Sequence, residues 1–218
     1  MNSFWNSSVD ASLSAIASAS PTPGGGAASS LSAAIGLALV RMAVAVSMKS
    51  SSVADEPTLA SINEALLDIG NQLKEAANED MDAFNKYMVA IKLPKGSSEL
   101  DEARNKAIDI AVEAAIEAPL RAAELITTAL EKSIQALPFI KETILSDLFA
   151  GAVLLNAACV AIQLNVDVNA NSKRLLPRKA IFQHRKTKFA NDCEGLLATI
   201  QEFGVERGYR FKAADLVK

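Results

Sequence analysis

The stretch from Ser20 to Met48, SPTPGGGAASSLSAAIGLALVRMAVAVSM, decides how this chain folds. Two prolines at its start are incompatible with a regular helix, and three glycines allow backbone conformations that other residues rarely adopt. This is therefore the strongest structural break in the sequence. The residues after the glycines carry a single charge, Arg41, and predict a helix from about Ala27 to Ser50. Because so apolar a helix must be covered on most sides, it belongs at the centre of a bundle.

Working outward, the remaining segments also have helical periodicity, and no run of alternating residues indicates a strand. Pro119 should kink or divide one of the long helices, and Ser146 resembles an N-cap with Asp147 in the first turn. The fold class predicted is all-α: one domain over residues 1–218, a bundle of about six helices that dimerises through its apolar helices. The other predicted helices are Asn2–Ala19, Leu59–Ile91, Ser98–Ala136, Ser146–Asn171 and Lys179–Glu206.

The composition narrows the class of protein. Net charge is −3, which gives no general case for binding nucleic acid. Cys159 and Cys193 lack metal-ligand spacing, and the chain has one histidine, so no metal site is predicted and a reducing cytoplasm is the expected compartment.

No basic region precedes an apolar stretch at the N-terminus, so no signal peptide is expected. Ala27–Met48 and Leu148–Leu164 raise the question of a membrane, but the mid-helix Arg41 favours a soluble bundle.

Three glycines directly before a helix place bare backbone N–H groups at the positive end of its dipole. Gly24, Gly25 and Gly26 therefore make a candidate site for a carboxylate or phosphate. The loop lacks the Lys-Ser/Thr pair of a P-loop and the spacing of a dinucleotide fingerprint. A plain turn between helices explains it equally well.

Asp80 shares a helix face with Phe84, Tyr87 and Ile91, whereas Asp82 points away and is expected to be solvated. A carboxylate on an apolar stripe is costly unless it has a partner or a role, so Asp80 is either in an ion pair or in a site. Lys92 and Lys95 flank Pro94, where a chain break can face a cleft.

A third group of polar residues lies on the helix that starts near Ser146. Asp147 and Asn165 are eighteen residues apart, so they share a face at opposite ends of that helix. Gly151 and Ala158 leave room between them for another helix or a ligand. This helix face is suited to a dimer interface as well as to a ligand pocket.

Residues 173–188 form a basic segment without an acid between its cations. Such a run is usually a solvated surface, although it can attract a polyanion. The cations of this segment are Lys173, Arg174, Arg178, Lys179, Arg185, Lys186 and Lys188.

The order of these motifs resembles the formiminotransferase-cyclodeaminase C-terminal domain family over residues 3–172. The opening loop and the Ala-rich helix match the family, and so do an acidic pair, an aromatic and a Lys-Leu-Pro-Lys end on the next helix. The matching residues are Ser20–Ala28, Glu79-Asp80, Phe84, Lys92–Lys95, Glu117–Leu120, Ser146-Asp147 and Leu164–Val166.

The resemblance implies an all-helical homodimer that binds tetrahydrofolate derivatives as substrates, with no tightly bound cofactor and no metal. Family members close 5-formiminotetrahydrofolate to 5,10-methenyltetrahydrofolate with loss of ammonia. Others interconvert methenyl- and 10-formyltetrahydrofolate with water. Both reactions need proton transfer to a leaving group or from water, and a stabilised charge on the one-carbon unit.

Under this resemblance Asp80 or Asp147 takes the acid/base or electrostatic role, and Lys92 donates a proton or holds the glutamate tail of folate. The expected substrate-binding residues are Pro23, Gly24, Gly25, Gly26, Tyr87, Lys95 and Asn165.

The chain departs from the family after its first long helix, where members usually have a lysine-rich stretch. Here Met48-Lys49-Ser50-Ser51-Ser52 keeps one lysine. If those cations hold the folate glutamate, this chain either binds polyglutamylated folate poorly or uses the basic segment 173–188 instead. Three functions stay open: a cyclodeaminase or cyclohydrolase acting on folate, an enzyme of the same fold with another amidine-like or cyclic substrate, and a non-catalytic helical binding protein.

Overall fold

The computed structural model describes residues 4–49 and 52–211. Within them the chain forms six α-helices, four short 3₁₀ helices and no strand, which confirms the predicted all-α class. The 3₁₀ helices are Phe4–Asn6, Leu137–Phe139, Glu142–Ile144 and Leu176–Arg178. The α-helices are α1 (Val9–Ile16), α2 (Gly25–Met48), α3 (Glu56–Ala90), α4 (Ser98–Ala136), α5 (Leu145–Ala170) and α6 (Lys179–Val205).

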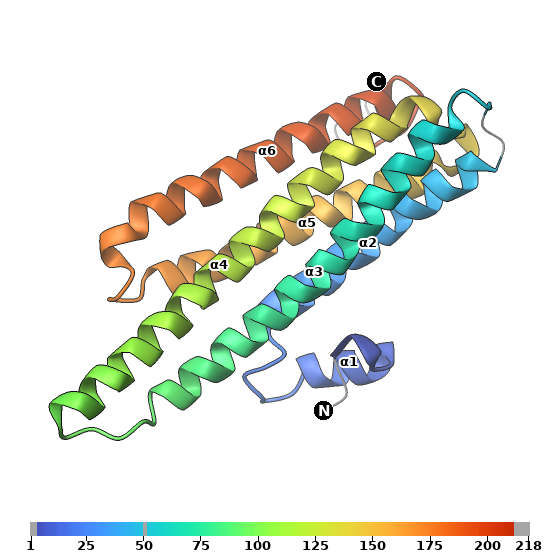
Figure 1. Cartoon of the computed structure of the whole chain (residues 1–218). Helices are drawn as coiled ribbons and strands as arrows, with labels where there is room; N and C mark the ends of the chain where they lie inside the picture. The colour runs from blue at the N-terminus through green and yellow to red at the C-terminus, as the bar shows by residue number, and fades with distance from the viewer. Residues whose placement is uncertain (1–3, 50–51, 212–218) are drawn as a thin grey trace.

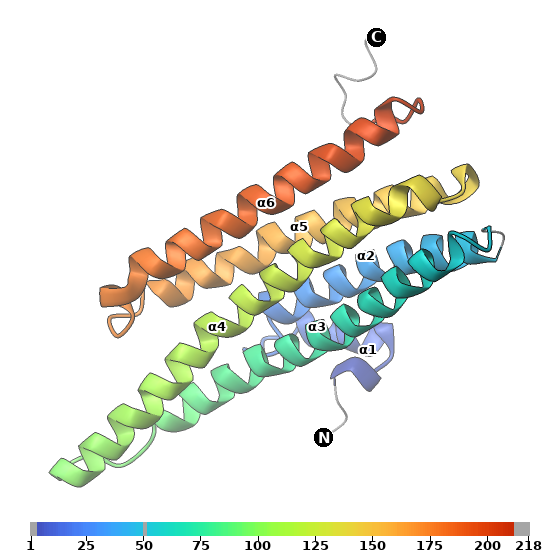
Figure 2. The same cartoon turned by 45° about the horizontal axis from the view of Figure 1, so that its top comes forward.

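Helices α2 to α5 form an up-and-down bundle (Figure 1). α3 packs against α2, α4 against α3 and α5 against α4, and α5 closes the ring by packing against α2. α6 lies along α4 and α5 as an added helix, and α1 stands on the side of the bundle away from α6 (Figures 1 and 2). One continuous core of mostly Leu, Ile, Val and Ala runs through α2 to α6.

Most helix ends follow the turn chemistry of the sequence. Gly24 caps α2 in an extended conformation, and Pro57 occupies the first turn of α3, a position that proline favours. Ser97 caps α4, where its Oγ accepts a hydrogen bond from the backbone N of Leu100 at 3.3 Å. The predicted bounds of α2 to α6 agree with the observed bounds to within about three residues, and the predicted end of the first long helix at Ser50 lies outside the described residues.

Three details of the predicted helices are wrong. The single helix expected over Asn2–Ala19 is interrupted because Ser8 caps α1 anew, and Asn2 itself lies outside the described residues. Ser146 is not the N-cap of α5, because the helix already begins at Leu145 after a 3₁₀ turn. Of the two effects expected of Pro119, a kink or a division, the division does not occur, because α4 continues through it as one helix.

Helices α2 and α5 touch where two glycines meet. A Cβ added to Gly36 would lie 2.7 Å from the carbonyl oxygen of Gly151, and one added to Gly151 would lie 2.5 Å from that of Gly36. Gly151, whose neighbour the sequence left open, therefore faces a helix of the same chain. By length and composition alone, α2 and the segment Glu142–Ala170 could each cross a membrane; here they lie side by side in the bundle.

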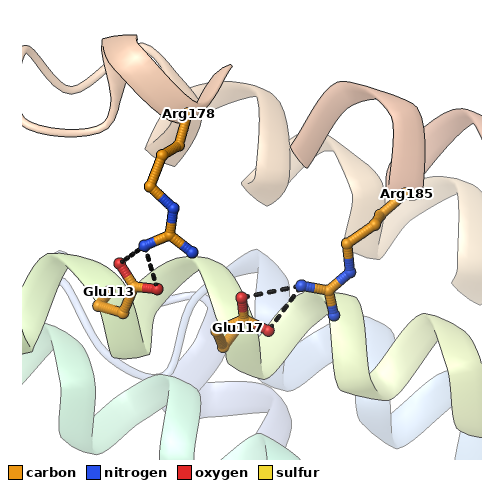
Figure 3. A network of polar contacts seen from close by, with 4 residues as sticks. All are labelled: Glu113, Glu117, Arg178 and Arg185. Carbon is orange, nitrogen blue, oxygen red and sulfur yellow. Dashed lines mark hydrogen bonds and ion pairs between the residues drawn. The ribbon is translucent and has the colours of Figure 1, made fainter. Parts of the chain in front are cut away.

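Ion pairs fasten α6 and the turn before it to α4 (Figure 3). Arg178 donates to both carboxylate oxygens of Glu113 at 2.7 Å, and Arg185 donates to those of Glu117 at 2.8 and 2.9 Å. The acids stand four residues apart on α4, so they present one row of charge to α6. Further ion pairs join Arg174 to Asp109, Lys186 to Asp167 and Lys188 to Asp192, so most of the basic segment 173–188 is neutralised within the chain.

The helices of the ring differ in length. α3 and α4 have 35 and 39 residues, whereas α2 and α5 have 24 and 26. The α3–α4 hairpin consequently extends past the start of α2 and the end of α5 (Figures 1 and 2). A step in the bundle surface results at this end.

Candidate functional site

A cavity of about 760 Å³ lies at that step, between the loop before α2, the second half of α3, the first half of α4 and the end of α5. A volume of this size suits a ligand as large as a folate. Its lining consists of Pro21, Thr22, Gly24, Gly25, Gly26, Asp80, Met81, Phe84, Tyr87, Ile108, Ala111, Val112, Ala115, Asn165, Val168, Asn169, Asn171, Ser172, Lys173 and Arg174.

Asp80 lies on the cavity wall against the first turn of α2. A Cβ added to Gly26 would overlap Oδ2 of Asp80 and lie 3.1 Å from Nδ2 of Asn165. The third glycine of the loop is therefore required by the close approach of α3 and α5 to the start of α2. Burial disfavours the charged form of Asp80 and raises its pKa from 3.8 to about 6.

Asn165 brings an unpaired donor to the same place. Its Nδ2 is buried and has no hydrogen-bond partner among the residues that the structure describes. A buried donor without an acceptor costs roughly 1–3 kcal/mol. Because Asn165 lines the cavity, Asp80 and Asn165 together offer a proton-transfer group beside a hydrogen-bond donor.

A second amide on α5 shapes the cavity through α4. Pro119 has no N–H and so leaves the carbonyl oxygen of Ala115 without its helical partner. Nδ2 of Asn169 donates to that oxygen at 2.6 Å. Ala115 and Asn169 both line the cavity, so this bond holds α4 and α5 together at its wall. The bond also explains how α4 continues as a helix through a proline.

The cavity has apolar as well as polar walls. Phe84 and Tyr87 come from α3, while Ile108 and Val112 come from α4. Their side chains give a surface against which the flat faces of an aromatic ring system can pack. Polar groups gather instead at the start of α2 and along the end of α5. The arrangement is that of a site for a largely flat molecule with a few polar contacts.

Six of the ten predicted site residues come together in this cavity: Gly24, Gly25, Gly26, Asp80, Tyr87 and Asn165. Pro23 is not in the lining, although its neighbours Thr22 and Gly24 are. Asp82 is exposed, as expected.

The other predicted residues lie elsewhere. Lys92 and Lys95 are exposed on the α3–α4 connection, beyond the cavity. Asp147 lies in the first turn of α5, and about 27 Å of helix separates it from Asn165. The structure therefore does not bring Lys92 or Asp147 to Asp80.

Sequence reasoning missed the wall that α4 supplies and the rim at the end of α5. The α4 residues are small or apolar, so nothing distinguishes them from core residues in the sequence. Pro119 was a usable signal, because a helix that continues through a proline must satisfy the carbonyl oxygen four residues earlier. In the sequence, nothing distinguishes Lys173 and Arg174 from the other cations of the basic segment 173–188.

Residues 4–49 and 52–211 contain no cluster of three or more His, Cys, Asp or Glu side chains that could hold a metal ion. Cys159 and Cys193 are both buried and free.

A family model described as formiminotransferase-cyclodeaminase matches residues 8–175 of this chain. Among solved structures, a formiminotetrahydrofolate cyclodeaminase from Thermotoga maritima is similar, with a TM-score of 0.80 and 22% sequence identity. The match covers 94% of this chain and 99% of that one, and at this identity it shows a shared fold. Curated proteins give no match.

Proposed function

The chain belongs to the formiminotransferase-cyclodeaminase family, and on this premise we propose that it is a formiminotetrahydrofolate cyclodeaminase. Its substrate would be 5-formiminotetrahydrofolate and its products 5,10-methenyltetrahydrofolate and ammonia. The observation that carries the proposal is a carboxyl group with a pKa of about 6, Asp80, on the wall of a cavity large enough for a folate. No tightly bound cofactor and no metal has a part in this chemistry.

The reaction needs one group that both accepts and donates a proton. N10 of the folate attacks the carbon of the protonated formimino group on N5; the N10–carbon bond forms and N10 loses its proton. The amino group on that carbon then takes up a proton and leaves as ammonia. A carboxyl group with a pKa near 6 is present in both forms near neutral pH, so Asp80 can take the first proton and give the second.

The product also needs stabilisation of charge. After ammonia leaves, the methenyl carbon shares a positive charge with N5 and N10. The carboxylate of Asp80 attracts this charge in a partly buried site, where electrostatic interactions are stronger than in water. In the proposed complex Asn165 donates its unpaired N–H to the folate and helps to fix the one-carbon unit beside Asp80.

The test is an absorbance assay for methenyltetrahydrofolate with the wild type and with Asp80→Asn. We expect kcat/KM of the wild type to rise between pH 5 and 7 as the carboxylate form accumulates. Asp80→Asn should lower turnover by roughly 10²- to 10⁴-fold, the usual contribution of acid–base catalysis, and remove the pH dependence. A folded Asp80→Asn variant with full turnover would contradict this mechanism.

The same preparation separates the alternatives. Turnover of methenyl- and 10-formyltetrahydrofolate without activity on the formimino substrate would indicate a cyclohydrolase. If 5-formyltetrahydrofolate, a stable folate, binds but nothing reacts, the chain is a non-catalytic binding protein. If no folate binds, another amidine-like or cyclic substrate becomes the better proposal.

We also infer that the chain works as a homodimer in the cytoplasm. The side of α2 and α5 that α3 and α4 leave uncovered carries exposed apolar side chains, which marks an interaction surface. Nε of Arg41 on α2 is buried with no hydrogen-bond partner among the described residues. A second copy would cover this surface. The exposed side chains are Ile35, Met42, Val153, Val160, Leu164 and Val168.

A further inference from the structure

The two ends of the cavity differ in charge. Asp80 lies at the end formed by the start of α2, whereas Lys173 and Arg174 lie at the rim formed by the α5–α6 connection. Asn165 and Asn169 lie between them along α5, and about two helical turns, roughly 10 Å, separate Asn165 from the rim. An elongated ligand with one anionic end therefore meets opposite charges at the two ends of the site.

Arg174 is held in place by α4. Its guanidinium donates to Oδ1 of Asp109 at 2.5 Å and to Oδ1 of Asn105 at 2.8 Å. Asp109 offsets the charge of Arg174 and fixes the α5–α6 connection against α4. Arg174 thus builds the rim, and the net positive charge there comes from its neighbour.

That neighbour, Lys173, is unlike the other cations of the basic segment. Arg178, Lys179, Arg185, Lys186 and Lys188 all bind an acid or amide within the chain. Among residues 4–49 and 52–211, no ion pair or hydrogen bond joins the Lys173 ammonium to another side chain. It is exposed at the mouth of the cavity, where an ammonium can reach a ligand without first breaking an internal contact.

We propose that Lys173 binds a carboxylate of the glutamate tail of the substrate and so sets the direction in which the folate lies in the cavity. The proposal rests on the function proposed above and assigns the tail to the α5–α6 connection. The glutamate carboxylates bind at Lys173, and the reacting N5–N10 region reaches Asp80 at the other end.

The other place for an anion is the first turn of α2, whose bare N–H groups favour negative charge. Asp80 already lies against that turn at Gly26. A second carboxylate there would face repulsion from Asp80 above pH 6, so the start of α2 is a poor site for the tail. Lys49, the one lysine kept after α2, lies at the other end of this 24-residue helix, about 36 Å from the first turn. The rim at Lys173 is therefore the better site for the tail.

The test is a binding titration of the full chain with two ligands, 5-formyltetrahydrofolate and its analogue that lacks the glutamate. The variants are Lys173→Gln and, as a matched control, Lys141→Gln, which removes an exposed lysine at the far end of the bundle. For Lys173→Gln we expect Kd for the glutamate-bearing ligand to rise roughly two- to fivefold, as for loss of a solvent-exposed ion pair. Kd for the analogue should not change, and Lys141→Gln should bind both ligands as the wild type does.

The outcomes are distinct. If the wild type binds the folate and Lys173→Gln binds it equally well, the tail lies elsewhere and this inference fails while the proposed function stands. If the wild type binds neither ligand, the proposed function is wrong, and the inference, which rests on it, is wrong too. Equal weakening of both ligands by Lys173→Gln would show a structural effect and also overturn the inference.

Discussion

At the scale of single residues, the site depends on a carboxyl group beside a glycine. Asp80 is close enough to Gly26 that no other side chain fits at position 26 without moving it. The same close packing keeps water away from the carboxylate and raises its pKa to about 6. The proton-transfer property proposed for Asp80 is thus a consequence of packing, and it should be measurable as a cost to stability.

Replacing Asp80 by Asn tests this cost. The pKa of Asp80 is higher in the folded chain than its ordinary value of 3.8, so between these values the folded state binds more protons than the unfolded state. Stability should therefore fall as pH rises from 4 to 7. Asp80→Asn should raise the free energy of unfolding by roughly 1–3 kcal/mol at pH 8 and change it little at pH 4.

Chemical denaturation of both proteins at the two pH values measures this difference. A variant that is less stable than the wild type at pH 8 would mean that the Asp80 carboxylate has a stabilising partner in the folded chain. The sequence predicted only that Asp80 needed a partner or a role, because it lies on an apolar stripe. It did not identify Gly26 as the neighbour, since that contact joins residues far apart in the chain.

At the scale of the elements, the crossing of α2 and α5 fixes the distance between the helices that carry Gly26 and Asn165. Gly151→Ala should therefore destabilise the chain, because its Cβ would meet the backbone of Gly36 at 2.5 Å. We expect a loss of roughly 1–3 kcal/mol, as for overpacking of a core. Gly195→Ala on α6 is the control, since nothing lies within 4 Å of its Cβ, and it should stabilise by about 0.5–1 kcal/mol.

Thermal or denaturant unfolding of the two alanine variants gives the comparison. Equal stability of the two would contradict the close contact between α2 and α5. The helices themselves were predictable from hydrophobic period and from prolines and glycines, so their bounds needed little correction. Which small residue faces which helix was not predictable. The sequence around Gly151 is equally compatible with a dimer interface, a ligand pocket or a contact between two helices of one chain.

The proline in α4 gives a second test at this scale. Asn169→Leu removes the donor to the part-buried Ala115 carbonyl and should cost roughly 0.5–1.5 kcal/mol of stability, the usual net contribution of a hydrogen bond. In a Pro119→Ala background the helix supplies its own N–H to that carbonyl, so the same Asn169→Leu change should cost less. A double-mutant cycle measures this coupling. Additive effects would show that Asn169 and Pro119 act separately.

At the scale of the whole molecule, α6 shows the limit of sequence interpretation most clearly. Its length was predicted, but its basic residues were ambiguous between a solvated face and a polyanion site. The acids on α4 that pair with Arg178 and Arg185 lie more than sixty residues away in the chain. The pairing follows from how α6 packs on α4, so the sequence alone could not reveal that Lys173 stands apart.

The uncovered face of α2 and α5 leads to the last prediction, that the chain is a dimer in solution and that Val160→Glu makes it a monomer. Val160 lies on α5 within the exposed apolar stripe, and a second copy covering it would bury a glutamate there without a partner. Ile181 on α6 is a matched control, because both side chains are 56% exposed. Ile181→Glu should remain a dimer, since α6 is not part of the proposed interface.

Sedimentation at micromolar concentration distinguishes these cases. A wild-type chain that sediments only as a monomer would refute the dimer, and a monomeric Ile181→Glu would place the interface on α6 instead. A wild-type chain that leaves the membrane fraction only with detergent would mean that lipid, rather than a second copy, covers α2 and α5. Because the cavity opens at the end of these helices, Val160→Glu also shows whether folate binding needs the second copy.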